Sequence, residues 1–376
     1  MFCFWLYLWS FRLKIFHNRK NVLFLILCIF VSCILTELCV TYALFNVYIL
    51  PFAIVPIVVR TFFDSRTALF THLIIVLICS LMVPFPHEFL LLQTIAGMVV
   101  TFSLRNLSER SQLIRCAFFI FLSYAICYMS LTLFQEANLN KINWMMMLYF
   151  GINFILVMFT YVLVYMLEKT FGYVSDITLV ELSNINNPIL KKLSETCPGT
   201  FQHSLQVSIL ASEAAAKIGA NAQLVRTGAL YHDSHVTEGV KIAEKALLPK
   251  AVISFIRTHH GRGKAKYFYN SFKNQYPDKP INDELFTYPG PNPFSKETAV
   301  LMMADSVEAA SRSLKEHTEE SISALVNKII DGQIADGLLK SAPLTFKDVE
   351  TIKSVFVDKL KTMFHTRISY PDLKKQ

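Results

Sequence analysis

The first 167 residues consist largely of apolar runs with short polar interruptions. The runs cover residues 1–11, 22–40, 42–59, 68–83, 89–104, 116–134 and 144–167. Several reach the ~20 residues that a helix needs to cross the hydrocarbon core of a bilayer, and the shorter ones can extend into their flanks. This pattern predicts a polytopic helical membrane domain with seven spans in contact with the lipid bilayer. The first run is too short for a complete span, so we expect that its upstream part is absent from the sequence.

Basic residues between the runs predict the orientation of these spans. They cluster in every second loop, as Arg12, Lys14, Arg19 and Lys20, then Arg60 and Arg66, then Arg105, Arg110 and Arg115. Among the alternate loops only Lys141 is basic. Because Lys and Arg in short loops stay on the cytoplasmic side, this distribution predicts a multi-pass protein of the cytoplasmic (inner) membrane with its C-terminal part in the cytoplasm.

Charge density changes sharply after Leu167. The residues up to this point hold 10 Lys/Arg and 5 Asp/Glu, and the remaining 209 hold 26 and 23. We therefore expect a membrane domain over 1–167, a linker helix over 168–197 and a cytoplasmic domain over 198–376. Five of the eight excess positive charges lie in the membrane part, and the rest form no basic patch with interleaved aromatic residues, which argues against binding of a nucleic acid polymer. The eight cysteines include no CxxC pair, so neither a disulfide framework nor a thiolate metal site is indicated.

The second half shows helical apolar spacing almost throughout. The expected helices are Ser204–Ile218, Gln223–Tyr231, Val236–Leu247, Ala251–Arg257, Glu297–Leu314, Glu320–Ile330 and Phe346–Met363. Because no series of alternating apolar and polar residues suggests strands, we predict an all-α fold. Thr200 is the expected N-cap of the first of these helices. The preceding linker, interrupted at Asn186-Asn187-Pro188, can pass motion from the membrane domain or act as a plain tether.

Histidines and aspartates in this half suggest a metal site. A single histidine on a helix is more often a satisfied core residue than a ligand, but five of the ten histidines fall within 58 residues. Asp305 lies in an apolar stretch, where an unpaired charge is costly. The candidate ligands are His203, His232, Asp233, His235, His259, His260 and Asp305. Imidazole and carboxylate without thiolate suit iron or manganese, with zinc as an alternative.

The pairing of an aspartate with a neighbouring histidine suggests two divalent metal ions. Adjacent helical residues diverge by about 100°, so Asp233 can reach a second ion beside the one that His232 binds. Two such ions can activate water for phosphoester hydrolysis, and the sequence has neither a GxSxG nucleophile nor a glycine-rich phosphate loop with its lysine. Arg312, two turns after Asp305, can bind a phosphate oxygen, although an ordinary solvated arginine explains it equally well.

Taken together, these segments resemble the seven-transmembrane HD phosphohydrolases, the bacterial membrane-bound cyclic-di-AMP phosphodiesterases. The segments that carry the resemblance are 198–204 (PGTFQHS), 228–233 (GALYHD), 258–261 (THHG), 288–291 (YPGP), 303–309 (MADSVEA) and 365–371 (HTRISYP). The resemblance implies hydrolysis of one phosphodiester of cyclic-di-AMP. It also implies that His203, His232, Asp233 and Asp305 bind one ion, and that Asp233, His235, His259 and His260 bind the other. Asp233, which bridges the two ions, is then the catalytic residue.

The sequence departs from the family after Asp233. Relatives continue with Ile-Gly-Lys and a few dozen further residues before the next ligand histidine, whereas Asp233-Ser234-His235 joins the two ends directly. An internal deletion, natural or from a gene-model error, explains this junction.

The sequence leaves three functional hypotheses. The first is a membrane enzyme controlled by a membrane or extracellular signal, with a homodimer as a reasonable assembly. A membrane receptor that binds nucleotide or metal without turnover is the alternative, and a transporter is a third that only the spans support.

Overall fold

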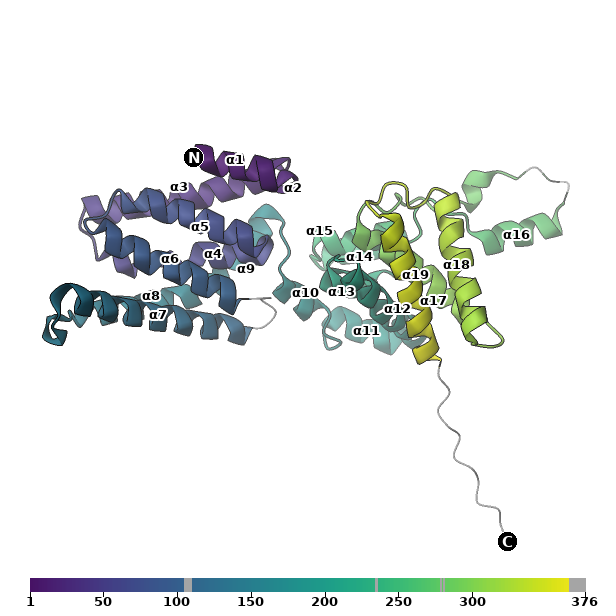
Figure 1. Cartoon of the computed structure of the whole chain (residues 1–376). Coiled ribbons are helices and arrows are strands. Elements are labelled where there is room, and N and C mark those ends of the chain that lie inside the picture. The colour runs from purple at the N-terminus through teal and green to yellow at the C-terminus, as the bar shows by residue number, and fades with distance from the viewer. Residues whose placement is uncertain (105–109, 234–235, 278, 280, 365–376) are drawn as a thin grey trace, which may run out of the picture. The chain divides into compact units, whose positions relative to one another are not determined.

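The described chain is helical and divides into two compact units. The computed structural model describes residues 1–104, 110–233, 236–277, 279 and 281–364. Over these residues the single extended pairing is an isolated bridge between Lys264 and Thr287, and the predicted all-α fold class is confirmed. The units are Met1–Thr178 and Leu179–Gln376 (Figure 1).

The first unit holds the apolar runs. Its helices are α1 (Phe2–Phe11), α2 (Leu13–Phe16), α3 (Arg19–Thr41), η1 (Val47–Ile49), α4 (Ile54–Phe62), α5 (Ser65–Ser80), α6 (Pro86–Ser103), α7 (Arg110–Glu136), η2 (Leu139–Lys141), α8 (Met145–Met158) and α9 (Thr160–Phe171). By length and composition, three helical stretches in the described residues can cross a membrane, Arg19–Thr41, Ser111–Glu136 and Met145–Phe171. They correspond to three of the seven predicted runs, 22–40, 116–134 and 144–167. The runs at 1–11, 42–59 and 68–83 form shorter apolar helices.

The third apolar run, 42–59, is interrupted by a break between two helices. Val47–Ile49 forms a short 3-10 helix, and α4 begins only at Ile54, after Pro51. The carbonyl oxygens of Tyr48 and Leu50, which the break frees, both accept hydrogen bonds from Nδ2 of the buried Asn153 on α8, at 3.0 and 2.9 Å. The Asn153 side chain therefore satisfies the carbonyl of Tyr48 and adds a second donor to that of Leu50, which also accepts from the Phe52 amide at 2.9 Å.

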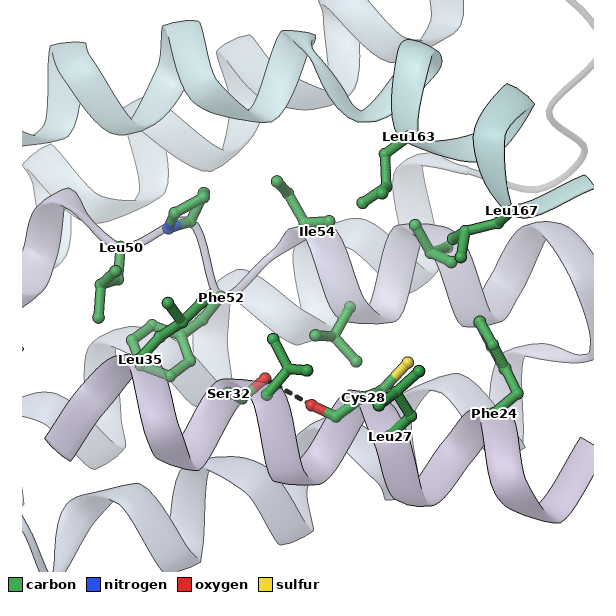
Figure 2. A pocket seen from close by; sticks show the side chains of 14 residues that line it. Phe24, Leu27, Cys28, Ser32, Leu35, Leu50, Phe52, Ile54, Leu163 and Leu167 are labelled. Carbon is green, nitrogen blue, oxygen red and sulfur yellow. Dashed lines mark hydrogen bonds between the residues drawn. The ribbon is translucent and has the colours of Figure 1, made fainter. Parts of the chain in front are cut away.

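A cavity of about 300 Å³ lies between α3, the segment that leads into α4, and α9 (Figure 2). Phe24, Leu27 and Leu35 line it from α3, and Leu163 and Leu167 line it from α9. Apart from Cys28 and Ser32 the lining is hydrocarbon, and the Ser32 hydroxyl donates to the Cys28 carbonyl oxygen at 2.8 Å. The lining of the cavity is thus almost entirely apolar.

The expected linker helix over 168–197 is in fact three separate pieces. α9 ends at Phe171 because Gly172 adopts a left-handed conformation with φ of 70°. Two short helices follow, α10 (Asp176–Leu182) and α11 (Pro188–Thr196), and Pro188 at the start of α11 is compatible with a helix only in its first turn. The boundary between the two compact units falls inside α10, after Thr178.

One face of a later helix, α13 (Ala222–Tyr231), binds the end of α10. The Thr227 hydroxyl donates to the carbonyl oxygen of Leu179 at 3.0 Å, and the Tyr231 hydroxyl donates to that of Leu182 at 2.8 Å. Gln223 Nε2 donates to the Ser183 hydroxyl at 3.0 Å. These three residues of α13 are spaced by four, so they share one face of the helix. The connector is thereby fixed to the helix that precedes His232.

The second unit is a bundle around the buried helix α17. Its remaining helices are α12 (Pro198–Lys217), α14 (Val236–Lys245), α15 (Lys250–Thr258), α16 (Lys266–Gln275), η3 (Asp283–Phe286), α17 (Lys296–Ser311), α18 (Glu319–Ala335) and α19 (Phe346–Met363). Ser295 caps α17 through a reciprocal pair of hydrogen bonds with Thr298, and α17 is buried almost continuously from Thr298 to Glu308. This burial explains why residues 299–304 of α17 are apolar without interruption.

Two details of this unit differ from the sequence prediction. Thr200 does not cap α12, because the helix already begins at Pro198, whose fixed backbone conformation suits the first helical position. α16 was not predicted. Figure 1 shows it set off from the bundle, and its Tyr269 and Phe272 contact the Phe286 ring of η3.

Candidate metal centre

Asp305 is the residue around which the candidate centre is built. It lies on α17, and its side chain is 10% exposed. Its Oδ1 lies 2.9 Å from Nε2 of His203 on α12 and 3.3 Å from Nε2 of His232 at the end of α13. Ligand atoms of these three residues all lie within 4.8 Å of one another. The structure therefore brings together three of the predicted ligands from three helices.

Two further predicted ligands, His259 and His260, lie beside this group. They follow the last residue of α15, and His260 Nδ1 is 3.8 Å from Asp305 Oδ2. The ring centroids of His232 and His259 are 5.2 Å apart, and those of His259 and His260 are 3.9 Å apart. Since the rings of His203 and His232 are separated by 5.5 Å, the four imidazoles form one continuous row.

Each end-of-helix histidine is oriented by its own backbone. Nδ1 of His232 donates to the Ala229 carbonyl oxygen at 2.6 Å, and Nδ1 of His259 donates to that of Ile256 at 2.9 Å. Because the proton is on Nδ1, the lone pair of each neutral ring is on Nε2. In His232 this lone pair faces the Asp305 carboxylate, an unfavourable arrangement unless a proton or a cation lies between the two groups. The donor set therefore fits a divalent cation.

Burial lowers the pKa of the histidines of this site, and neighbouring carboxylates raise it. Burial alone would lower the pKa of His203, but its hydrogen bonds to Asp305 and Glu308 and their charges raise this pKa to about 9. Burial, together with the neighbouring His260 and His232, lowers the pKa of His259 to about 3, and the pKa of His260 is lowered chiefly by burial. His259 and His260 are thus neutral near pH 7, as metal ligands must be, while a metal must displace a proton from His203.

The carboxylate at the centre remains ionised. Burial would raise the pKa of Asp305, but the hydrogen bond from His203, together with the adjacent imidazoles of His232 and His259, holds it far below the usual range of a carboxyl group. The site thus combines a buried negative charge with a row of imidazoles.

Two residues predicted as ligands or catalytic groups are not part of this cluster in the described structure. Asp233 is exposed, although its charge is near enough to raise the pKa of His260. His235, together with Ser234 and therefore the short junction itself, lies outside the described residues.

Arg312 lies near the centre, but among the described residues it makes no hydrogen bond to Asp305. Its Nε and Nη2 both donate to Oε1 of Glu308, at 2.8 and 2.7 Å, and Nη2 also donates to Gln206 at 3.2 Å. The Arg312 side chain is 44% exposed. It is therefore an ion-paired arginine at the edge of the site rather than a freely solvated one.

Comparison with known proteins assigns both halves of the chain. Residues 1–175 match the family model described as "7TM receptor with intracellular HD hydrolase", and residues 200–310 match the HD domain model. The chain belongs to this 7TM receptor and HD hydrolase family. The HD match includes every predicted ligand from His203 to Asp305, so the resemblance predicted from the sequence is confirmed.

The curated relatives of this family include two enzymes. The cyclic-di-AMP phosphodiesterase PgpH of Bacillus subtilis (strain 168) is 30% identical over 371 residues, which covers 88% of this chain and 52% of that protein. PgpH of Listeria monocytogenes serotype 1/2a is 30% identical over 372 residues, with 87% and 51% covered. The chain thus spans about half the length of these curated relatives.

A solved structure gives a third comparison. The crystal structure of the HD domain of L. monocytogenes PgpH in complex with cyclic-di-AMP is 32% identical, covers 49% of this chain and 100% of that chain, and has a TM-score of 0.46.

Sequence reasoning missed two side chains that border the centre of this HD domain. Glu308 hydrogen-bonds His203, with its Oε2 at 2.5 Å from Nδ1, and is fully buried. Its position one turn after Asp305, in the same apolar stretch, was a signal that could have identified it. Tyr288 lies with its ring centroid 4.2 Å from that of His260. No periodicity predicts this contact, because Tyr288 is in a loop.

Proposed function

We propose that this chain is a metal-dependent phosphodiesterase that hydrolyses one phosphodiester bond of a cyclic dinucleotide, cyclic-di-AMP. The observation that carries the proposal is the convergence of His203, His232 and Asp305, with His259 and His260 beside them. Similarity to two cyclic-di-AMP phosphodiesterases supports the choice of substrate.

The residues of the centre divide into two ligand groups in this proposal. His203, His232 and Asp305 would bind one divalent ion, manganese or iron, with Asp233 as a shared ligand. His235, His259 and His260 would bind the second ion together with Asp233. When bound, such ions supply Lewis acidity for attack of water on a phosphoester and for departure of the leaving oxygen. Arg312 would bind a phosphate oxygen through its half-exposed guanidinium group.

The proposed location of this reaction is the cytoplasmic face of the inner membrane. Loops rich in Lys and Arg alternate along the sequence with loops that have almost none. This alternation supports a location of residues 198–376 on the same side of the membrane as the cluster at Arg12. A signal received by the membrane part would then control hydrolysis, and a homodimer is the proposed assembly.

Metal-dependent turnover tests the proposal directly. The full chain is placed in lipid nanodiscs, stripped with chelator, reloaded anaerobically with Mn²⁺ or Fe²⁺, and assayed for conversion of cyclic-di-AMP to the linear dinucleotide. We expect turnover that requires the metal and that His259→Ala reduces by more than the roughly 10–100-fold typical of residues that only support a ligand. His87→Ala, which changes an exposed histidine of α6, is the matched control. Turnover that survives both chelation and His259→Ala would contradict the proposal.

A variant with a longer junction separates the enzyme from the alternative, a receptor that binds nucleotide or metal without turnover. The segment that follows the HD dipeptide in the B. subtilis relative is inserted after Asp233. The turnover of cyclic-di-AMP by this variant is then compared with that of the original chain. Turnover in both supports the enzyme. Turnover only in the longer variant, with nucleotide binding retained in the original chain, supports the receptor.

A further inference from the structure

Glu308 is a buried carboxylate whose two oxygen atoms serve different partners. Its side chain is 0% exposed, and it lies on α17 three residues after Asp305. Oε2 accepts a hydrogen bond from His203 Nδ1 at 2.5 Å. Oε1 accepts two from Arg312, from Nε at 2.8 Å and from Nη2 at 2.7 Å. A buried charge is costly unless it is paired and hydrogen-bonded, and here both oxygens meet that condition.

His203 depends on Glu308 in a way that the other oriented histidines do not. His232 and His259 follow the last residue of a helix, where the carbonyl oxygen three residues earlier is available to Nδ1. His203 is inside α12, and the carbonyl oxygens of its own helix accept hydrogen bonds from the next turn. Its Nδ1 therefore needs an acceptor from another helix. Glu308 provides it and so turns Nε2 toward Asp305, at 2.9 Å.

The same carboxylate determines where the Arg312 side chain lies. Arg312 follows the last residue of α17, one turn beyond Glu308, and both contacting nitrogens bind the single oxygen Oε1. Gln206 on α12 supplies a further acceptor for Nη2 at 3.2 Å. Glu308 and Gln206 therefore hold the guanidinium group beside the helix that carries His203, while 44% of the side chain remains exposed to a ligand.

We propose that Glu308 is a positioning residue that fixes the metal-binding imidazole of His203 and the phosphate-binding Arg312 in one shared geometry. The inference rests on the proposed function for the role of Arg312, and on the metal site alone for the role of His203. A carboxylate that receives the Nδ1 proton of a ligand histidine orients the ring and increases the basicity of its other nitrogen. Metal binding and substrate binding then both depend on Glu308.

Glu308→Gln separates this proposal from a merely structural role. The amide carries no charge and has one acceptor oxygen, so it weakens the contact that it keeps and loses the other, which affects both His203 and Arg312. In the full chain in nanodiscs, we expect the affinity for Mn²⁺, measured by calorimetry without substrate, to fall by roughly 10–100-fold. The KM for cyclic-di-AMP at saturating Mn²⁺ should rise by roughly tenfold, the cost of one charge-assisted hydrogen bond. Glu213→Gln changes a half-exposed residue of α12 that pairs with Lys359 and not with the site, and it should alter neither quantity.

Arg312→Gln isolates the second half of the proposal. It should raise KM as much as Glu308→Gln does and leave the Mn²⁺ affinity within about threefold of the original, since His203 keeps its acceptor. The double variant should show no further rise in KM, because the two residues act through one contact.

The outcomes are distinguishable from failure of the proposed function. If no chain turns over cyclic-di-AMP but Glu308→Gln still weakens Mn²⁺ binding, the proposed reaction is wrong and the role of Glu308 at His203 stands. An unchanged Mn²⁺ affinity in a folded Glu308→Gln variant overturns the inference. Should that variant not fold, Glu308→Asp decides: it keeps the charge but is one methylene too short to reach both partners, so an unchanged Mn²⁺ affinity and KM would equally overturn it.

Discussion

At the scale of single residues, Asp348 links α17 and α19, two helices of the HD domain that are distant in sequence. It lies in the first turn of α19, forms a reciprocal capping pair with Thr345, and accepts a hydrogen bond from Lys296 of α17 at 2.8 Å. The hydrogen bond from Lys296, followed by those from Thr345, lowers the pKa of Asp348. α19 is thereby tied to the start of the helix that carries Asp305.

This arrangement predicts a pH-dependent loss of stability. A carboxyl group whose pKa is lower in the folded state stabilises the protein above its unfolded pKa of about 3.9, and that contribution disappears as the pH falls through the folded pKa. Asp348→Asn should therefore lower the free energy of unfolding at pH 7, by no more than about 1 kcal/mol for an ion pair near the surface. Thermal unfolding from pH 7 to pH 3 measures it. The two proteins should converge below about pH 4, and a constant difference at all pH values would contradict the assignment.

The individual residues of the site were predictable to different degrees. His203, His232, His259, His260 and Asp305 could be selected because imidazole and carboxylate in apolar helices are chemically unusual. Their common location could not be derived from spacing, since it depends on how four helices pack. Glu308 was missed for the same reason: its position one turn after Asp305 was a signal, but an acidic residue there also fits an exposed helix face.

At the scale of helices, the close approach of α13 and α15 brings His232 beside His259. Gly228 makes this approach possible, because a Cβ atom at this position would lie 2.4 Å from the ring of the buried Phe255 on α15. Such a distance requires either the ring or the helix to move.

Gly228→Ala should therefore destabilise the HD domain. Overpacking of a buried contact costs about 1–3 kcal/mol, which exceeds the gain of about 0.5–1 kcal/mol from the higher helix propensity of alanine. Gly332→Ala on α18 is the matched control, since no atom outside its own helix backbone lies within 4 Å of the added Cβ, and it should be neutral or stabilising. Thermal unfolding of both variants measures the difference. Equal stability of the two would mean that α13 and α15 do not rely on this contact.

Most helices of the HD domain could be predicted, whereas helix ends in the apolar half could not. Phe346–Met363 was predicted to the residue, because its apolar spacing and the preceding Thr345 are both informative. In the apolar half, hydropathy marks a run but does not identify a break within it. The run 144–167 is divided between α8 and α9 at Phe159, and the run 42–59 is divided after Pro51.

At the scale of the whole molecule, the distribution of basic loops predicts the side of the membrane on which the HD domain lies. Cys197, exposed just before α12, can report this side. In a variant that retains it as the single cysteine, a membrane-impermeant maleimide should label inverted vesicles and leave intact spheroplasts unlabelled. Asn140→Cys in the cysteine-free background, at an exposed position of a predicted outer loop, should show the opposite pattern. Labelling of Cys197 in spheroplasts would reverse the predicted topology.

The attachment of the connector to α13 has a consequence for how such proteins evolve. Two of its three hydrogen bonds end on backbone carbonyl oxygens, those of Leu179 and Leu182, which every amino-acid sequence supplies. The hydrogen bonds of Thr227 and Tyr231 therefore depend on where the backbone of the connector lies and not on its side chains. A recombination that joined a different segment upstream would preserve this attachment as long as the new segment followed the same backbone course. The HD domain could in this way be joined to new upstream segments without any change to the helix that precedes His232.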